Sequence, residues 1–169
     1  IKDDLNNNSD FIKIGMCENC SDSWKYGEDE YDLISSLSEY INIHIYHFDW
    51  LGLIDENGVT CCDNYKFASD FMQNHGYNQL LRWGISGGSN GLSSESNIEL
   101  SWDDLNFGDN SSNKIFLFIG DDVINMKEQN NIIIEQTDLQ LINNVPNIWI
   151  KIGACADTGI TKTYYNDFD

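Results

Sequence analysis

Basic residues are scarce in this sequence: nine Lys and Arg stand against 28 Asp and Glu, which gives a formal net charge of −19. Such a chain lacks the positive surface that binds phosphate backbones, so nucleic acid is disfavoured as a partner. The same repulsion disfavours anionic membrane surfaces. No apolar run approaches the roughly 18 residues of a membrane-spanning segment, so we expect no membrane insertion in this chain.

Histidine and proline are scarce as well. The one proline, Pro146, argues against Pro-rich linkers, and only three histidines are present. His44 and His47 lie three positions apart on an expected strand, which places them on opposite faces and prevents them from chelating one ion together. Neither histidine is clearly paired in the sequence with a nucleophile and a carboxylate, so a hydrolase triad has little support and we expect no enzyme.

Apolar residues are plentiful by contrast. Hydrophobic residues make up 41% of the chain and aromatic residues 12%, including five Trp, which is enough for a sizeable core. This composition argues against disorder, and 169 residues is the length of one domain. We expect a polar lead-in over residues 1–10, followed by a single domain over residues 11–169.

The cysteines and the glycosylation sequons favour an extracellular or cell-surface protein only weakly. Two disulfides with one thiol left over would suit a secreted domain, but reduced core cysteines would suit the same count. The five cysteines are Cys17, Cys20, Cys61, Cys62 and Cys155. The Asn-x-Ser/Thr sequons at Asn7, Asn19 and Asn110 are about as many as this Asn- and Ser-rich composition produces by chance.

Hydrophobic patterning predicts strands that alternate with helices. Strands are expected at Phe11–Cys17, Ile41–Trp50, Lys114–Ile119 and Ile148–Ile152. Helices are expected at Tyr26–Tyr40, Tyr65–Trp83, Glu95–Leu105 and Thr137–Val145, with a hairpin turn at Asp55–Gly58 and a Gly/Ser loop at Gly84–Ser94. This order predicts an α/β fold with a mainly parallel central sheet and helices on both faces.

The ends of three expected segments carry oxygen-bearing side chains. In open α/β sheets, ligands bind at the carboxyl ends of the strands, so we inspected the loops after Cys17, Trp83 and Ile119. Hydroxyls and carboxylates that converge on one sheet edge are the ligands that Mg²⁺ or Ca²⁺ prefers. A protein of this charge would also enrich divalent cations near such an edge.

The order of these loops resembles a von Willebrand factor A domain with its metal-ion-dependent adhesion site. Asn19-x-Ser21-x-Ser23 stands where that family has D-x-S-x-S, and the Gly-Gly-Ser segment ending at Ser89 stands where it has a Gly-rich loop with Thr. FIGDD places Asp121 in the acidic position after a strand, and IWIKIGA is similar to the next strand. The resemblance implies a Rossmann-like fold and a Mg²⁺ site, or a Ca²⁺ or Mn²⁺ site, formed by Asn19, Ser21, Ser23, Ser89 and Asp121. Because Asn19 replaces an Asp and Ser89 replaces a Thr, we expect a degenerate site.

The resemblance implies a non-enzymatic adhesion module that binds a protein partner or a neighbouring subunit at the carboxyl edge of its sheet, with or without a divalent cation. One alternative is a structural subunit of an extracellular or surface assembly. A second alternative is a thioredoxin-like thiol-disulfide oxidoreductase, because Cys17 and Cys20 form a C-x-x-C directly after a strand. For this pair, a local disulfide or buried thiols is the simpler reading.

Overall fold

The chain is described by a computed structural model that covers residues 1–5, 8–32, 40–61, 66–73, 80–92, 96–103 and 114–153. The strands in these residues are β1 (Lys2–Asp3), β2 (Lys13–Cys17), β3 (Glu30–Tyr31), β4 (Tyr40–Tyr46), β5 (Lys66–Gln73), β6 (Leu81–Asn90), β7 (Ile98–Ser101), β8 (Lys114–Ile119), β9 (Asp122–Asn125), β10 (Asn131–Ile134), β11 (Leu141–Ile142), β12 (Val145–Pro146) and β13 (Ile148–Gly153). Two short 3₁₀ turns, η1 (Phe48–Trp50) and η3 (Gln136–Leu139), complete this set.

The expected α/β fold is wrong. The structure is mostly strand (55%) and almost without helix (6%), and no helices cover the faces of its sheets in the described part of the chain. The expected helix at Tyr65–Trp83 contains β5 and the start of β6, and the one at Glu95–Leu105 contains β7. The segment Thr137–Val145 holds most of η3 and all of β11. The expected helix at Tyr26–Tyr40 contains β3, and its residues 33–39 lie outside the described part of the chain.

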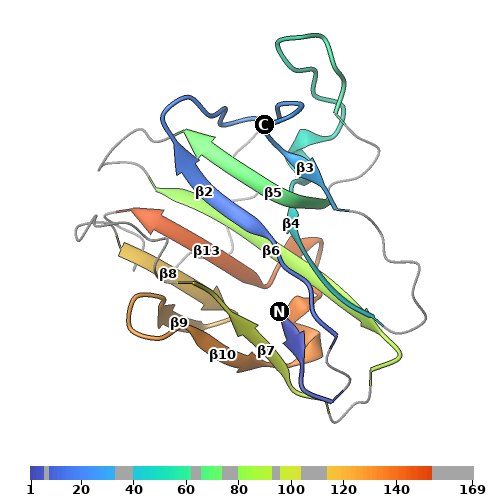
Figure 1. Cartoon of the computed structure of the whole chain (residues 1–169), viewed down its shortest axis with the longest axis vertical. Helices are drawn as coiled ribbons and strands as arrows, with labels where there is room; N and C mark the ends of the chain where they lie inside the picture. The colour runs from blue at the N-terminus through green and yellow to red at the C-terminus, as the bar shows by residue number, and fades with distance from the viewer. Residues whose placement is uncertain are drawn as a thin grey trace.

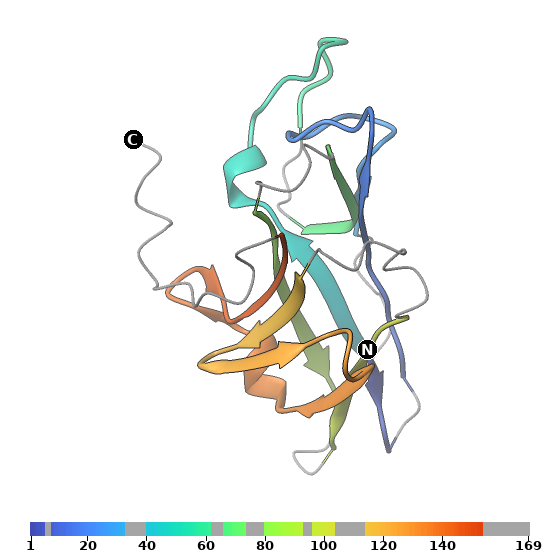
Figure 2. The same ribbon diagram turned by 90° about the vertical axis from the view of Figure 1, so that its left-hand side faces the viewer.

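The strands form one large sheet and two small ones (Figure 1). The large sheet has the order β2-β5-β4-β6-β13-β8-β9, with β3 also paired to β5, and its pairs are antiparallel except for β2 with β5. A three-stranded sheet has the order β1-β7-β10, and β11 pairs with β12. In a view turned by 90°, β2 (blue) stands apart from β4 (teal) (Figure 2). The edge of the large sheet that ends in β2 therefore forms a second layer beside the middle of the same sheet.

The core lies on one face of the large sheet. The central strands point alternate apolar side chains toward this core, and several residues of their other face, such as His44 and Ser86, are buried as well. The most deeply buried apolar side chains of these strands are Ile43, Ile45, Trp83, Ile85, Leu117 and Ile148. The strands predicted at Lys114–Ile119 and Ile148–Ile152 are confirmed as β8 and β13.

The expected Gly/Ser loop at Gly84–Ser94 begins as a strand instead, because β6 runs from Leu81 to Asn90. Glycine is needed here for close packing rather than for a turn. A Cβ on Gly87 would lie 2.3 Å from the backbone oxygen of Asn42 on β4, and a Cβ on Gly84 would lie 2.8 Å from Cγ of Pro146. Only a glycine backbone fits that close to a neighbouring strand.

The first ten residues, expected as a polar lead-in, pack against the rest of the fold where the structure describes them. Ile1 and Asp3 are buried, and β1 pairs with β7. The carboxylate of Asp10 accepts a hydrogen bond of 2.9 Å from the backbone N–H of Ile43. This segment therefore stabilises the fold.

Candidate functional site

Three of the five predicted metal ligands lie in one loop, directly after β2. The loop is held by its own hydrogen bonds: the N–H of Ser23 donates to Oγ of Ser21, and the N–H of Ser21 donates to the carboxylate of Glu28. Asn19 precedes them in a turn and is exposed. These hydrogen bonds hold the loop in shape.

The other two predicted ligands lie elsewhere. Ser89 is near the end of β6, where its hydroxyl donates to Oε1 of Gln136 at 3.0 Å, and Asp121 is exposed in the turn between β8 and β9. Figures 1 and 2 place the carboxyl ends of β2 and β6 at opposite ends of the molecule. The structure therefore does not bring Ser89 and Asp121 to the loop after β2. Within the described residues, no group of three or more His, Cys, Asp or Glu could hold a metal ion.

Cys17 and Cys20 form a disulfide with a Cα–Cα separation of 5.4 Å. In a thioredoxin-like domain such a pair begins a helix, which lowers the thiol pKa. Here Cys17 ends β2 and Cys20 lies in the loop that follows. Residues 18–32, which the structure describes, contain turns and β3 but no helix. The pair bridges a turn at the end of a strand.

The most distinctive surface feature is a hairpin formed by residues 51–61, which projects from one end of the molecule (Figure 1). Its two arms pair through Ile54 and Thr60. The predicted turn at Asp55–Gly58 is confirmed, because the N–H of Gly58 donates to the carbonyl oxygen of Asp55 and the N–H of Asp55 donates to that of Val59. The loop is an ordered hairpin.

The carboxylate of Asp55 fixes this turn. It accepts hydrogen bonds from the N–H groups of Asn57 and Val59 at 2.9 and 2.8 Å. Partial desolvation acts to raise the pKa of Asp55, but the backbone N–H groups of Val59, Asn57 and Tyr26 hold it below its ordinary value. An ion pair of 3.3 Å between Lys25 and Glu56 also ties the hairpin to the loop that follows β2.

Apolar side chains are exposed along the hairpin and at its base. Five of the twelve large hydrophobic residues that are exposed in the described chain fall within 12 consecutive positions: Phe48, Leu51, Leu53, Ile54 and Val59. Tyr26 is 66% exposed and lies on the loop to which the hairpin is tied. We call these six side chains the hairpin patch. Exposed apolar side chains on both faces of one projecting hairpin favour an interaction site, whereas single exposed apolar residues are ordinary.

The base of the hairpin is anchored by stacked rings. Trp50 is buried and stacks on the imidazole of His47 with ring centroids 3.6 Å apart, and Phe67 meets both rings edge-on. His47 Nε2 lies 2.9 Å from the buried carboxylate of Asp70, and its Nδ1 lies 3.4 Å from the exposed carboxylate of Asp49. Burial alone would lower the pKa of His47, but hydrogen bonds to these two carboxylates raise it to about 9. His47 is therefore a buried cation at neutral pH.

A second buried carboxylate, Asp29, interacts electrostatically with Asp70. Asp29 accepts a hydrogen bond of 2.8 Å from the N–H of Lys25, which places it beneath the same loop. Burial raises the pKa of Asp29 to about 7, and the charge of Asp70 contributes to the increase. The anchor of the hairpin thus contains two buried groups with raised pKa values, about 9 for His47 and about 7 for Asp29.

A serine, a histidine and an aspartate meet on the face of the large sheet that points away from the core. Ser86 Oγ lies 2.7 Å from His44 Nε2, across the β4–β6 pair, and His44 Nδ1 lies 3.7 Å from a carboxylate oxygen of Asp32. Burial lowers the pKa of His44 to about 3, and the charge of Lys66 adds to this decrease. Because Ser86 and His44 are only 2% and 3% exposed, a substrate cannot reach the hydroxyl in this conformation. We therefore interpret the trio as a packing network.

No protein-family model matches this chain, and neither the curated proteins nor the solved structures gave a match. Within the described residues, no helix is long and apolar enough to cross a membrane. The hairpin patch and the buried charged groups beneath it are therefore the features that point to a function.

Sequence reasoning placed the hairpin turn but missed the exposed patch. One signal was available: Leu53 and Ile54 are adjacent, so in an extended arm they point to opposite faces. A two-stranded hairpin at the molecular surface buries at most one face, so one of the two had to be exposed. The partners of His44 and His47 carried no comparable signal, since Ser86 and Asp70 are 42 and 23 positions away.

Proposed function

We propose that this chain is a non-enzymatic protein-binding module, and that the hairpin patch is its contact surface. The observation that carries the proposal is the concentration of exposed apolar side chains on a hairpin that internal hydrogen bonds hold in shape. An ordered hairpin loses little conformational entropy on binding, which favours affinity.

The charge around the patch indicates the kind of partner. The acidic side chains of Asp49, Asp55 and Glu56 flank the apolar residues, on a chain of net charge −19. A complementary surface is apolar at its centre and carries Lys or Arg at its rim. The same charge opposes self-association and anionic lipid, so we expect a basic protein partner. The Cys17–Cys20 disulfide supports an oxidising, extracellular compartment.

The experiment uses the full chain, immobilised and exposed to the secreted and cell-surface proteins of its source cells. Retained proteins are quantified for the wild type and for the double variant Ile54→Ser/Val59→Ser, which removes two exposed hairpin side chains. The matched control is Ile133→Ser/Ile142→Ser, because these residues are equally apolar and are 59% and 47% exposed elsewhere. Both variants should keep the wild-type unfolding temperature.

We expect a basic protein that the hairpin variant loses and the control retains, with binding weakened by added salt. Retention of the same proteins by both double variants would show that the hairpin is not the contact surface. Sedimentation of the chain alone tests the structural-subunit alternative: oligomers that depend on Ile54 and Val59 would make the partner a second copy.

A further inference from the structure

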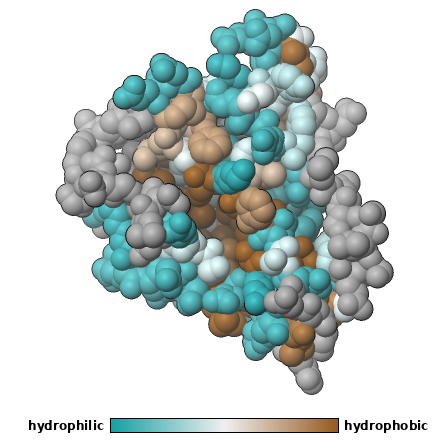
Figure 3. Space-filling view, viewed as in Figure 1, coloured by the Kyte–Doolittle hydropathy of each residue, from teal (hydrophilic) through white to brown (hydrophobic). Residues whose placement is uncertain are grey.

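A cavity of about 1030 Å³ separates β2 from the inner face of the large sheet. Its floor is formed by apolar residues of four neighbouring strands. Ile150 of β13 is partly exposed there, and the core residues Ile43 of β4, Ile85 of β6 and Leu117 of β8 form the closely packed bottom of the cavity. Ile14 and Met16 of β2 line the opposite wall. Figure 3 shows hydrophobic side chains (brown) gathered in a hollow near the middle of this face.

The sheet topology leaves this cavity open. β2 is the last strand of its sheet, and β7 belongs to a different sheet, so no strand pairing in the described chain joins β2 to β7. Leu100 of β7 and the residues that follow it line the cavity from that side. In the middle of β2, a Cβ on Gly15 would lie 2.9 Å from the ring of Phe71, so glycine lets that ring pack against the strand.

The size of the cavity argues for an occupant. Ligand pockets occupy about 300–1,000 Å³ and are mostly apolar with a few polar groups, which describes this cavity. Water is held only weakly by such apolar walls, because an ordered water molecule needs several polar hydrogen-bond partners.

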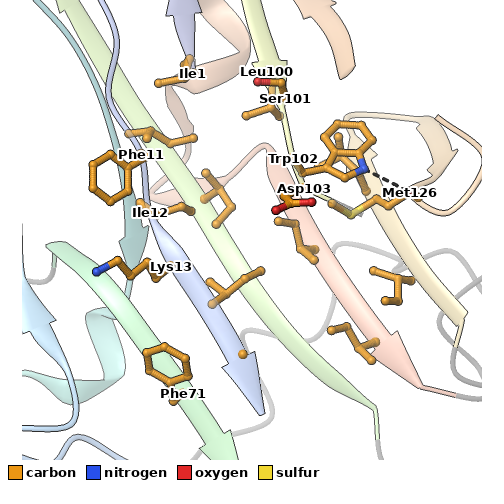
Figure 4. Close-up of a pocket in the computed structure, with 18 of the residues that line it drawn as sticks. Ile1, Phe11, Ile12, Lys13, Phe71, Leu100, Ser101, Trp102, Asp103 and Met126 are labelled. Carbon is orange, nitrogen blue, oxygen red and sulfur yellow. Dashed lines mark hydrogen bonds between the residues drawn. The ribbon is translucent and has the colours of Figure 1, made fainter. Parts of the chain in front are cut away.

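Polar groups are confined to the rim. Ser101 and Asp103 border the cavity on one side and Lys13 on the other, with the Lys13 amine directed away from Asp103 (Figure 4). Trp102 lies between Ser101 and Asp103, and its indole N–H donates to the carbonyl oxygen of Met126 at 2.9 Å. The indole is thereby fixed, and the rim beside it presents two oxygen-bearing side chains, the hydroxyl of Ser101 and the carboxylate of Asp103.

We propose that this cavity binds a small hydrophobic molecule with a hydrocarbon body and one hydrogen-bond donor, a hydroxyl or an amine, that reaches Ser101 and Asp103. The apolar walls take the hydrocarbon body. A carboxylate at the same end would face Asp103 on a chain of net charge −19, and this repulsion disfavours fatty-acid anions relative to alcohols and amines. This site is separate from the hairpin patch.

The test uses Nile red, a neutral apolar dye, as the fluorescent probe on the full chain. Three competitors with the same ten-carbon body distinguish the ligand class: decanol, decylamine and decanoate. We expect saturable dye binding that decanol and decylamine displace and decanoate does not. Absence of saturable binding, or preferential displacement by decanoate, would overturn the proposal.

Cavity-filling variants locate the binding. Ile14→Trp should abolish Nile red binding, and Met16→Phe, a smaller addition from the same strand, should weaken it if the first variant does not fold. The matched control is Ile133→Trp, which adds the same ring at a 59% exposed position of β10. Binding that survives in folded Ile14→Trp or Met16→Phe would place the dye elsewhere. Ile54→Ser/Val59→Ser should leave dye binding unchanged, which separates this proposal from the hairpin contact.

Discussion

His47 Nε2 and Asp70 Oδ2 lie 2.9 Å apart beneath the hairpin, and their side chains are 8% and 1% exposed. A buried ion pair is costly to break, because either partner alone is left as an uncompensated charge. Trp50 stacks on the same imidazole and begins the hairpin, so the pair couples the protonation of His47 to the anchoring of the binding surface.

Stability should fall as pH rises from 6.5 to 9. The pKa of His47 increases on folding from 6.5 to about 9, so its contribution is fully present below pH 6.5 and is lost as pH rises through 9. The loss is on the order of 3 kcal/mol. Asp29, whose pKa rises from 3.8 to about 7, adds to the decline up to pH 7, because its stabilising neutral form is lost. Urea unfolding at pH 6.5 and pH 9 measures the slope, and His47→Gln should flatten it above pH 7.

The two carboxylates that face His47 should contribute unequally to stability. Asp70→Asn leaves the buried imidazolium without its closest counter-charge and should cost about 3 kcal/mol. Asp49→Asn is the matched control: its side chain is 66% exposed, water screens its charge, and it should cost less than about 1 kcal/mol. Urea unfolding at pH 6.5 compares the two. Equal losses would contradict this prediction, because they would show that the exposed Asp49 stabilises the imidazolium as much as the buried Asp70 does.

Two neighbouring glycines of β6 should respond differently to alanine. A Cβ on Gly87 meets the backbone oxygen of Asn42 at 2.3 Å, so Gly87→Ala must separate β4 from β6 and should cost about 2–3 kcal/mol. A Cβ on Gly88 meets the side-chain oxygen of Asn42 at 3.4 Å, and that side chain can move. Gly88→Ala should therefore change stability by less than about 0.5 kcal/mol. Similar unfolding temperatures for the two variants would refute close packing at Gly87.

These two glycines also show which features the sequence could predict and which it could not. Short apolar runs bounded by turn residues identified β8 and β13, and Asp55–Gly58 identified the hairpin turn, because these signals are local. Gly87 and Gly88 were interpreted as a loop because glycine is typical of loops. Their actual role depends on Asn42, 45 positions earlier, which no local pattern reveals.

The helix expected at Tyr65–Trp83 failed for a different reason. Phe67 and Phe71 are four residues apart, a spacing that puts two side chains on one face of a helix and equally on one face of a strand. Pairing with β4 and β2 favoured the strand. This element supported the α/β prediction, and with it the idea that the loops after Cys17, Trp83 and Ile119 share one sheet edge. The predicted ligand set of Asn19, Ser21, Ser23, Ser89 and Asp121 depended on that edge.

That the chain is not an enzyme stays a prediction, and Ser86 and His44 allow it to be tested. If the pair serves packing, Ser86→Ala leaves the buried His44 Nε2 without its 2.7 Å partner and should cost about 1–3 kcal/mol. A fluorophosphonate probe, which labels nucleophilic serines, should not modify Ser86 in the folded wild type, because the hydroxyl is buried and a pKa of about 3 makes His44 a weak base. Labelling that Ser86→Ala removes would instead assign this trio a hydrolytic role. Ser89→Ala serves as the control, since its hydroxyl bonds to Gln136 and faces no histidine in the described contacts.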